Sequence, residues 1–184
     1  MAVALAGSVA VLSACSKTDG ARDSTAAGHD GSALDSGATD IPEGPCFSQT
    51  VDFQIGTGEA QFEALSDGDS LEVIHGTQDG HHILGSVRIQ NIGSVATIHF
   101  QVVPVADGVP VSDQVYRVRL SPDPEHGDCS GQAVGLYAYL GRIDPDTALF
   151  LGEATDIRMT ITTEAGEART HAVQVTPFLP VIEH

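Results

Sequence analysis

Apolar and polar residues alternate with a period of two along much of the chain beyond residue 46. Successive side chains of a β-strand point to opposite faces, so this period predicts strands with one buried face. No stretch in this region keeps the 3.6-residue period of a helix for three turns. Four stretches carry the alternation: residues 96–105 (ATIHFQVVPV), 114–120 (QVYRVRL), 156–162 (DIRMTIT) and 170–176 (THAVQVT).

The spacing of turn residues predicts how these strands are arranged. The last two stretches flank an EAGE turn and read as a hairpin, and Asp-Gly or Pro-rich turns separate the others. Residues 133–140 (AVGLYAYL) are apolar on both faces of the expected strand, which predicts a central strand covered on both sides. A first strand near residues 51–55 and a tail after Pro177 complete the set. We expect an all-β domain, an immunoglobulin-like β-sandwich of seven to nine antiparallel strands, with a jelly roll as the alternative.

The N-terminus predicts a different kind of segment. Residues 2–14 are uncharged and mostly apolar, too short for a transmembrane helix but of the length of a signal-peptide core. The sequence LSAC, ending at Cys15, resembles a bacterial lipobox, although the Lys or Arg that usually opens a signal is missing. We therefore expect a signal peptide at 1–14 and a palmitate-type lipid anchor on Cys15. A buried hydrophobic strand or helix is the alternative.

Composition separates a tether from a domain. Residues 15–45 are dominated by Ser, Thr, Gly, Ala and Asp and predict a disordered tether that follows the lipidated cysteine. The domain at 46–184 carries 19 acidic and 6 basic residues, a net charge of −13. This balance excludes nucleic acid and anionic lipid surfaces as partners, so the membrane is contacted through the lipid anchor alone, and it favours cations or cationic proteins.

The three cysteines fit this division. If Cys15 carries lipid, Cys46 and Cys129 remain as an even pair in an oxidising compartment. We expect them to form a disulfide that closes a long loop, worth roughly 4 kcal/mol in the chain-entropy model. Two free buried thiols are the alternative.

Three histidines gather in residues 74–90 (IHGTQDGHHILGSVRIQ). If residues 76–80 form a hairpin loop, His75 lies opposite His81, Val73 opposite Ile83 and Leu71 opposite Gly85. Directly opposed side chains point the same way, so His75 and His81 are candidate ligands for zinc or copper. His82 points to the other face. The alternative gives the two histidines a supporting role under the turn, where they close the core and bond to its backbone.

The segment from Phe53 to Ile92 resembles the N-terminal part of lipoproteins from predatory soil bacteria of the myxobacterial type. Those proteins combine a lipobox, a low-complexity tether and a tract close to G-P-Q-G-G-x-H after a DGD turn. The corresponding tract here is GTQDGHH, residues 76–82, in which Thr77 replaces the proline and Asp79 a glycine, and the family's histidine corresponds to His82. The resemblance implies a β-sandwich on a lipid tether and no specific activity.

Function is constrained mainly by what the chain lacks. It has no G-x-S-x-G, no H-E-x-x-H, no zinc-type cysteine spacing and no phosphate-binding loop. We therefore expect a non-enzymatic envelope lipoprotein without a cofactor, contacting an envelope or extracellular protein; the alternative is a lipoprotein that binds zinc or copper through His75 and His81. The residue after the lipobox is Ser16 and not the aspartate that retains some lipoproteins at the inner membrane, so we expect the outer membrane. The expected contact residues are Gln78, Asp79 and His82 in and beside the loop, and the outward-facing Thr97, His99, Gln101, Arg117 and Arg119.

Overall fold

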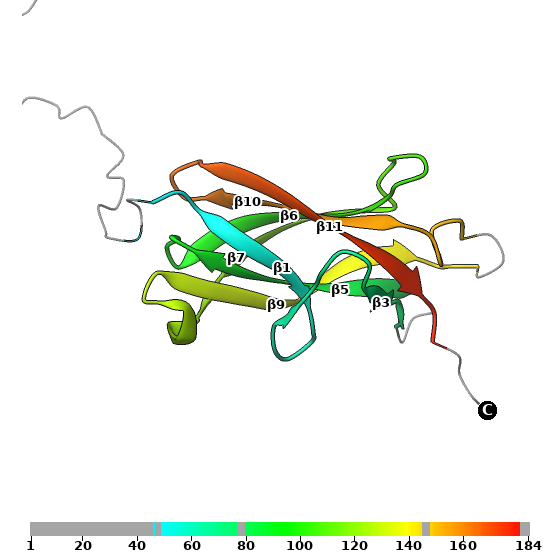
Figure 1. Cartoon of the computed structure of the whole chain (residues 1–184), viewed down its shortest axis with the longest axis horizontal. Coiled ribbons are helices and arrows are strands. Elements are labelled where there is room, and N and C mark those ends of the chain that lie inside the picture. The colour runs from blue at the N-terminus through cyan, green and yellow to red at the C-terminus, as the bar shows by residue number, and fades with distance from the viewer. Residues whose placement is uncertain (1–45, 47–48, 77–79, 145–147, 181–184) are drawn as a thin grey trace, which may run out of the picture. The chain divides into compact units, whose positions relative to one another are not determined.

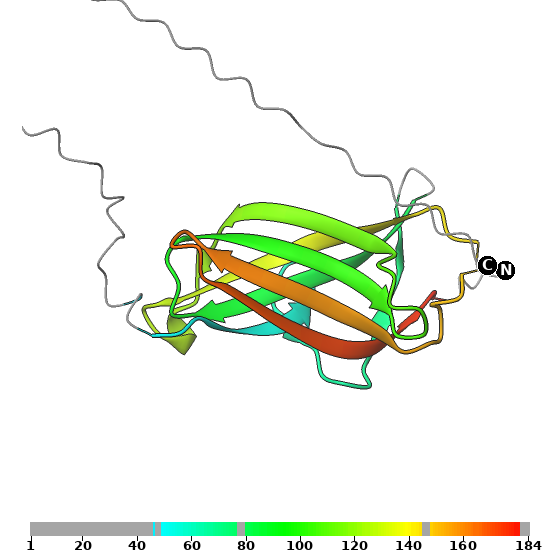
Figure 2. The same ribbon diagram turned by 90° about the horizontal axis from the view of Figure 1, so that it is seen from above.

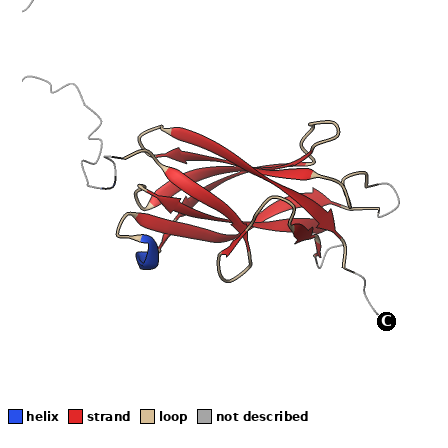
Figure 3. Ribbon diagram, in the orientation of Figure 1, coloured by secondary structure: helices blue, strands red, loops and turns tan. Residues whose placement is uncertain are grey.

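A computed structural model describes residues 46, 49–76, 80–144 and 148–180, and these form two packed β-sheets (Figure 1). Strands dominate, and a short 3₁₀ helix, η2 (Pro124–His126), lies between β8 and β9 (Figure 3). The strands are β1 (Asp52–Thr57), β2 (Glu63–Ala64), β3 (Ser70–Glu72), β4 (Ile74–His75), β5 (His81–Gln90), β6 (Val95–Pro104), β7 (Ser112–Arg119), β8 (Ser121–Pro122), β9 (Ser130–Gly141), β10 (Thr155–Thr163) and β11 (Ala168–Phe178).

The strands are divided between two sheets. The first sheet has the order β2-β1-β5-β9-β8, with β4 also paired to β5. The second sheet has the order β3-β11-β10-β6-β7, and Figure 2 shows β7 at its outer edge. All pairs are antiparallel except β3 with β11, which is parallel. The prediction of a β-sandwich is confirmed, whereas its assignment to the immunoglobulin-like type stays a prediction.

The core fills the space between the sheets, and it is formed by the apolar side chains at the alternating positions that the sequence predicts. Gly85 in β5 faces the centre, where a Cβ atom would lie 2.5 Å from Cε1 of Phe100 and 2.6 Å from Cε of Met159. The glycine therefore makes room for two large side chains of the second sheet. The fully buried residues on the facing strands are Ile83, Val87, Ile89, Ile98, Phe100, Val102, Ile157, Met159 and Ile161.

The segment from Ser70 to His75 corrects part of the predicted hairpin. Of the two strands in this segment, only β4 pairs with β5. The other, β3, belongs to the second sheet, where Leu71 lies opposite Pro177. The chain changes sheets at Val73, whose N–H donates to the carbonyl of Phe178 at 2.8 Å. The predicted pairings of Leu71 with Gly85 and of Val73 with Ile83 are therefore wrong, because the end of β11 provides a parallel partner that the local pattern does not reveal.

A second correction concerns residues 133–140, which were expected to be covered on both faces. Leu136 and Ala138 are buried, but Tyr137 and Tyr139 on the opposite face are 47% and 57% exposed. The neighbouring β8 pairs only with Gly131 and Gln132, so the second half of β9 has β5 as its sole paired strand within the described residues. Tyrosine tolerates this position since its ring is apolar and its hydroxyl reaches water.

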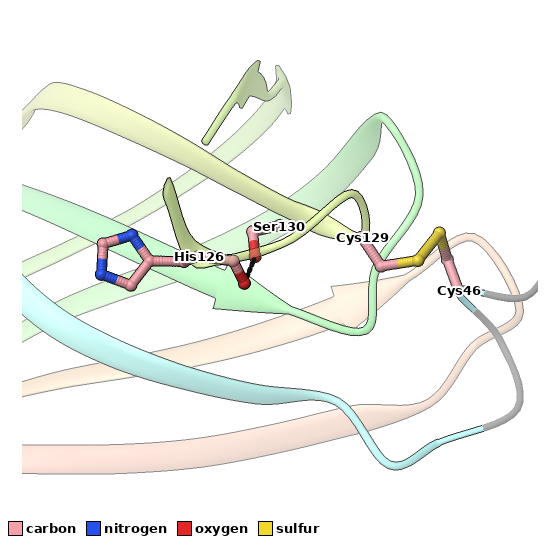
Figure 4. The surroundings of a disulfide bond; sticks show 4 residues. All are labelled: Cys46, His126, Cys129 and Ser130. Atoms are coloured by element: carbon pink, nitrogen blue, oxygen red, sulfur yellow. Dashed lines mark hydrogen bonds between the residues drawn. A yellow bond between two sulfur atoms is a disulfide. The ribbon is translucent and has the colours of Figure 1, made fainter. Parts of the chain in front are cut away.

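The predicted disulfide is confirmed. Cys46 and Cys129 are bonded, with Cα atoms 5.1 Å apart and a separation of 83 positions in the sequence. Figure 4 shows the bridge beside Ser130, whose hydroxyl donates to the carbonyl of His126 at 2.6 Å. Because Ser130 opens β9 and pairs with Gln90, the bridge fastens the start of the domain to the end of β5.

Cys15 and the other residues of the predicted signal peptide and tether, up to 45, lie outside the described residues. Across the part of the chain that is described, no helix has the length and apolar character needed to cross a bilayer.

Candidate functional site

The turn between β4 and β5 gathers histidine and tyrosine side chains at one end of the first sheet. His75 pairs with His81 and Ile74 with His82, as the parity of the sequence predicts for the first of these pairs. The N–H of Gly76 donates to the carbonyl of Gly80 at 2.7 Å and closes the loop. Gln78 and Asp79, two of the expected contact residues, lie outside the described residues.

His75 and His81 share a face but not an environment. Their ring centroids are 4.9 Å apart, with the planes inclined by 57°. His81 is buried, and its Nδ1 accepts a hydrogen bond from the backbone N–H of Ile143 at 3.3 Å, whereas His75 is exposed. His81 thus bonds to the backbone of the segment after β9.

This hydrogen bond has a chemical consequence for metal binding. A histidine that ligates a metal normally uses one ring nitrogen on the ion and donates a proton from the other. In neutral His81 the Nδ1 lone pair faces the Ile143 N–H, which assigns the proton to Nε2. Within the described residues, moreover, no group of three or more His, Cys, Asp or Glu is placed to hold an ion. The pair offers two ligands at most, one of them with its lone pair already engaged.

On the opposite face, His82 forms a surface with two tyrosines, which we call the histidine–tyrosine surface (His82, Tyr137 and Tyr139). The His82 and Tyr137 ring centroids are 4.8 Å apart. Tyr139 pairs with His82 across the strands and lies against Gly80, where a Cβ atom would be 2.7 Å from its Oη. All three side chains stand on paired strands of the first sheet, where the ladder between β5 and β9 shifts register between His81 and His82.

The electrostatics keep this surface uncharged near neutral pH. Desolvation by partial burial lowers the pKa of the His82 imidazole, and the nearby His81 lowers it further, against the opposing effect of Glu59. His82 is therefore neutral at pH 7, and its ring presents an apolar face beside Tyr137. A surface of three rings without net charge is suited to contact with another protein.

Comparisons with known proteins add little to this geometry. No family model matches the chain, and no curated protein matches it. Among solved structures, the CooA pilin subunit from enterotoxigenic Escherichia coli is similar with a TM-score of 0.31 and 10% sequence identity, covering 70% of this chain and 99% of the pilin chain. A likeness at that level carries no inference about this chain.

The expected contact residues of the second sheet are placed as predicted. They alternate with buried neighbours along β6 and β7 and face outward, with Arg117 and Arg119 exposed and the others half-buried. They belong to the second sheet, whereas the histidine–tyrosine surface is on the first. The outward-facing residues in question are Thr97, His99, Gln101, Arg117 and Arg119.

A charged network at the far end of β5 was not foreseen from the sequence. The Asp123 carboxylate accepts from Nε of Arg88 at 2.7 Å and contacts Nδ1 of His126 at 3.1 Å. The hydrogen bond with His126 is the main cause that lowers the pKa of Asp123, and Arg88 adds to it. The Arg88 guanidinium also lies 4.4 Å from the centre of the Phe62 ring. Arg88 and His126 line an open hollow of about 340 Å³, together with Asp52, Phe53, Gln54 and Gln90.

The sequence held a partial signal for one of these features. The motif Y-x-Y at residues 137–139 places two of the chain's three tyrosines on one strand face, which indicates an amphipathic face rather than a covered one. The contact of Arg88 with Asp123 spans 35 positions in the sequence, with β6, β7 and β8 between them, and has no local signal.

Proposed function

We propose that this protein is a non-enzymatic bacterial envelope lipoprotein, anchored through Cys15, whose β-sandwich binds another protein through the histidine–tyrosine surface. The observation that carries the proposal is the exposure of Tyr137 and Tyr139 beside a neutral His82 on paired strands. Exposed tyrosines on a rigid support are typical of binding surfaces, because they bury much area at little cost in side-chain entropy. The domain charge of −13 favours a neutral or basic partner.

The position of the disulfide supports a role on a tether. Cys46, where the predicted tether meets the domain, is held beside the Gln90 end of β5, and His82 is at the other end. At about 3.3 Å per residue the two ends are roughly 30 Å apart. A chain fastened at Cys46 would carry the histidine–tyrosine surface at the far end of the domain. The disulfide also favours an oxidising compartment such as the periplasm or the cell surface.

Two experiments on the full chain in bacteria test the two parts of this proposal. For the anchor, cells are labelled with a palmitate analogue; we expect label on the natural chain and none on a Cys15→Ala variant. Label that persists in the variant, or an unlabelled natural chain, would refute the lipid anchor.

For the contact surface, a photo-crosslinking amino acid is placed at Tyr139 and, as a matched control, at Arg169 of the second sheet. Arg169 is a suitable control because its side chain is 49% exposed on a regular strand. We expect a discrete protein adduct from position 139 and none from position 169. Identical adduct patterns at both positions, or no adduct at 139, would contradict the proposal.

The alternative function is a metal-binding lipoprotein with His75 and His81 as ligands for zinc or copper. The 4.9 Å distance between their rings favours it, and the hydrogen bond from Ile143 to His81 opposes it. Native mass spectrometry of the metal-stripped protein, titrated with zinc and with copper(II), distinguishes the two cases. One bound ion that is lost in His75→Ala would support the metal site; loose binding that is indifferent to this change would leave the histidines as supports of the turn.

A further inference from the structure

β7 is the last strand of the second sheet. One of its edges pairs with β6, and no strand among the described residues pairs with the other edge. β7 is eight residues long and pairs with β6 in continuous register, without a bulge. It contains no proline, glycine or lysine. Soluble proteins usually protect such edges with short strands, prolines, bulges or lysines, so a long regular edge is a candidate for pairing with another strand.

Other open stretches of edge in the described part of the chain are less suited to pairing. Along β9, Gly135 has a positive φ of 68° and the carbonyl of Tyr137 already accepts the Tyr116 hydroxyl. Along β11, His171 stacks on Phe53 of β1 with ring centroids 4.4 Å apart, so β1 lies against that edge. β9 also lies against β7, because the Tyr116 hydroxyl of β7 donates to the Tyr137 carbonyl, but the backbone pairing of β7 is regular over its whole length.

The hydrogen-bond pattern determines which residues of β7 offer their backbone to a new strand. The N–H of Leu120 donates to the carbonyl of Ser94 at 2.9 Å, in register with the pairs of β6 and β7. Antiparallel bonding alternates along a strand, so the even-numbered residues point their backbone groups at β6. The odd-numbered Asp113, Val115 and Arg117 point theirs toward the open edge.

The side chains of these three residues are self-complementary. In an antiparallel pair centred on Val115, this valine faces its own copy and Asp113 faces Arg117 twice, once on each side. Val115 is 66% exposed, and the Asp113 and Arg117 side chains are 54% and 76% exposed. If the partner strand were shifted by two residues in either direction, Val115 would lie opposite Arg117 or Asp113, and the central apolar contact would be lost.

The carboxylate of Asp113 can accept this additional partner. Its two oxygens contact Nε2 of His99 at 2.7 Å and Nε2 of Gln101 at 2.9 Å, on the outer face of the same sheet. A carboxylate has about four lone-pair sites, so a guanidinium from a second strand has room to bind. His99 and Gln101 then act as supports that hold the Asp113 side chain over the edge.

We propose that two copies of this protein pair through β7, antiparallel about Val115, and join their second sheets into one continuous sheet. The pairs Val115–Val115, Asp113–Arg117 and Arg117–Asp113 would each exchange two backbone hydrogen bonds. This two-fold contact uses the same surface on both copies, as symmetric dimers do. It involves neither the histidine–tyrosine surface nor its partner, and so stands or falls independently of the proposed function.

Cysteine cross-linking of the full chain in cells tests this pairing. Residues opposed in a hydrogen-bonded pair have Cα atoms about 5.5 Å apart, within reach of a disulfide. We expect Val115→Cys to give a disulfide-linked dimer on a non-reducing gel. The matched control is Val109→Cys, which is 61% exposed in the turn before β7 and should remain monomeric. The unsubstituted chain controls for Cys15.

Charge exchange in the Val115→Cys background decides the register. Arg117→Asp should abolish the dimer band by placing two carboxylates opposite each other, and adding Asp113→Arg should restore it. These side chains are exposed, and a thermal unfolding curve of each variant verifies that the domain remains folded. Equal cross-linking at 109 and 115, a band of a size other than the dimer, no dimer, or a dimer that ignores Arg117→Asp would overturn the proposal.

Discussion

A histidine lies near each end of β5, His126 of η2 at the Gln90 end and His82 at the other, but the two have different partners. At the Gln90 end, His126 is paired with a carboxylate that is 7% exposed and held by Arg88, and the disulfide is close by. At the His81 end, His82 has ring neighbours and a lowered pKa, and Tyr137 and Tyr139 are about half exposed.

The difference lies in what each arrangement stabilises. A buried carboxylate with two cationic or polar partners is costly to disturb, so the Gln90 end contributes to folding. Exposed rings on a sheet contribute little to folding but leave apolar area available for a partner. Substitutions at the two ends should therefore differ in kind: the first group changes stability, and the second changes binding.

The largest expected effect is at the disulfide. Replacing Cys46 and Cys129 by serine should lower the free energy of unfolding by about 4 kcal/mol, since the open chain regains the entropy that an 83-residue closure removes. Urea unfolding with and without reductant measures this. Reductant should shift the midpoint of the natural protein and leave the variant unchanged; equal midpoints for both proteins would show that this end is not fastened by the bridge.

The next effect is at Asp123. Asp123→Asn leaves Arg88 and His126 without their anionic partner and should cost about 1–3 kcal/mol at pH 7. The matched control is Asp156→Asn on the second sheet. Its carboxylate is 26% exposed and lies 3.4 Å from Arg158, so this pair should contribute under about 1 kcal/mol.

The pH dependence of this effect follows from the lowered pKa of Asp123. The folded state holds the carboxylate ionised at pH values where the unfolded chain already binds a proton. Its stabilising contribution is therefore complete above the unfolded pKa of 3.8 and is lost as the pH falls through the lower folded value. Urea midpoints of the natural protein and Asp123→Asn should converge on acidification; a constant difference down to pH 2 would contradict the assignment.

These features differ in how far the sequence could predict them. Period-two alternation identifies the strands and their buried faces, and the parity of residues 74–90 identifies the pairing of His75 with His81, because both depend on residues close in the chain. The disulfide follows from counting cysteines. The change of sheet at Val73 depends on Phe178, more than a hundred residues away, and the bond between Arg88 and Asp123 depends on how β8 is placed. Contacts of that range leave no period in the sequence.

A smaller effect is expected from His82. Its pKa is lowered in the folded state, so as the pH falls below 6.5 the unfolded chain takes up a proton before the folded one. Stability should decline between pH 6.5 and the lower folded pKa and stay level outside this window. His82→Asn should remove that part of the decline. An NMR titration of the His82 ring that gives a pKa at or above 6.5 would contradict this expectation.

The smallest effect on stability is expected at Tyr139, and it makes the comparison sharpest. Tyr139→Ser removes a ring that is 57% exposed and should change the free energy of unfolding by no more than about 0.5 kcal/mol. Cross-linking from a photoreactive group at Tyr137 in the same chain should nevertheless fall strongly, because half of the aromatic surface is gone. If Tyr139→Ser instead destabilised the domain as much as Asp123→Asn, the ring would be a structural cover for β5. The two ends of the strand would then serve the same purpose.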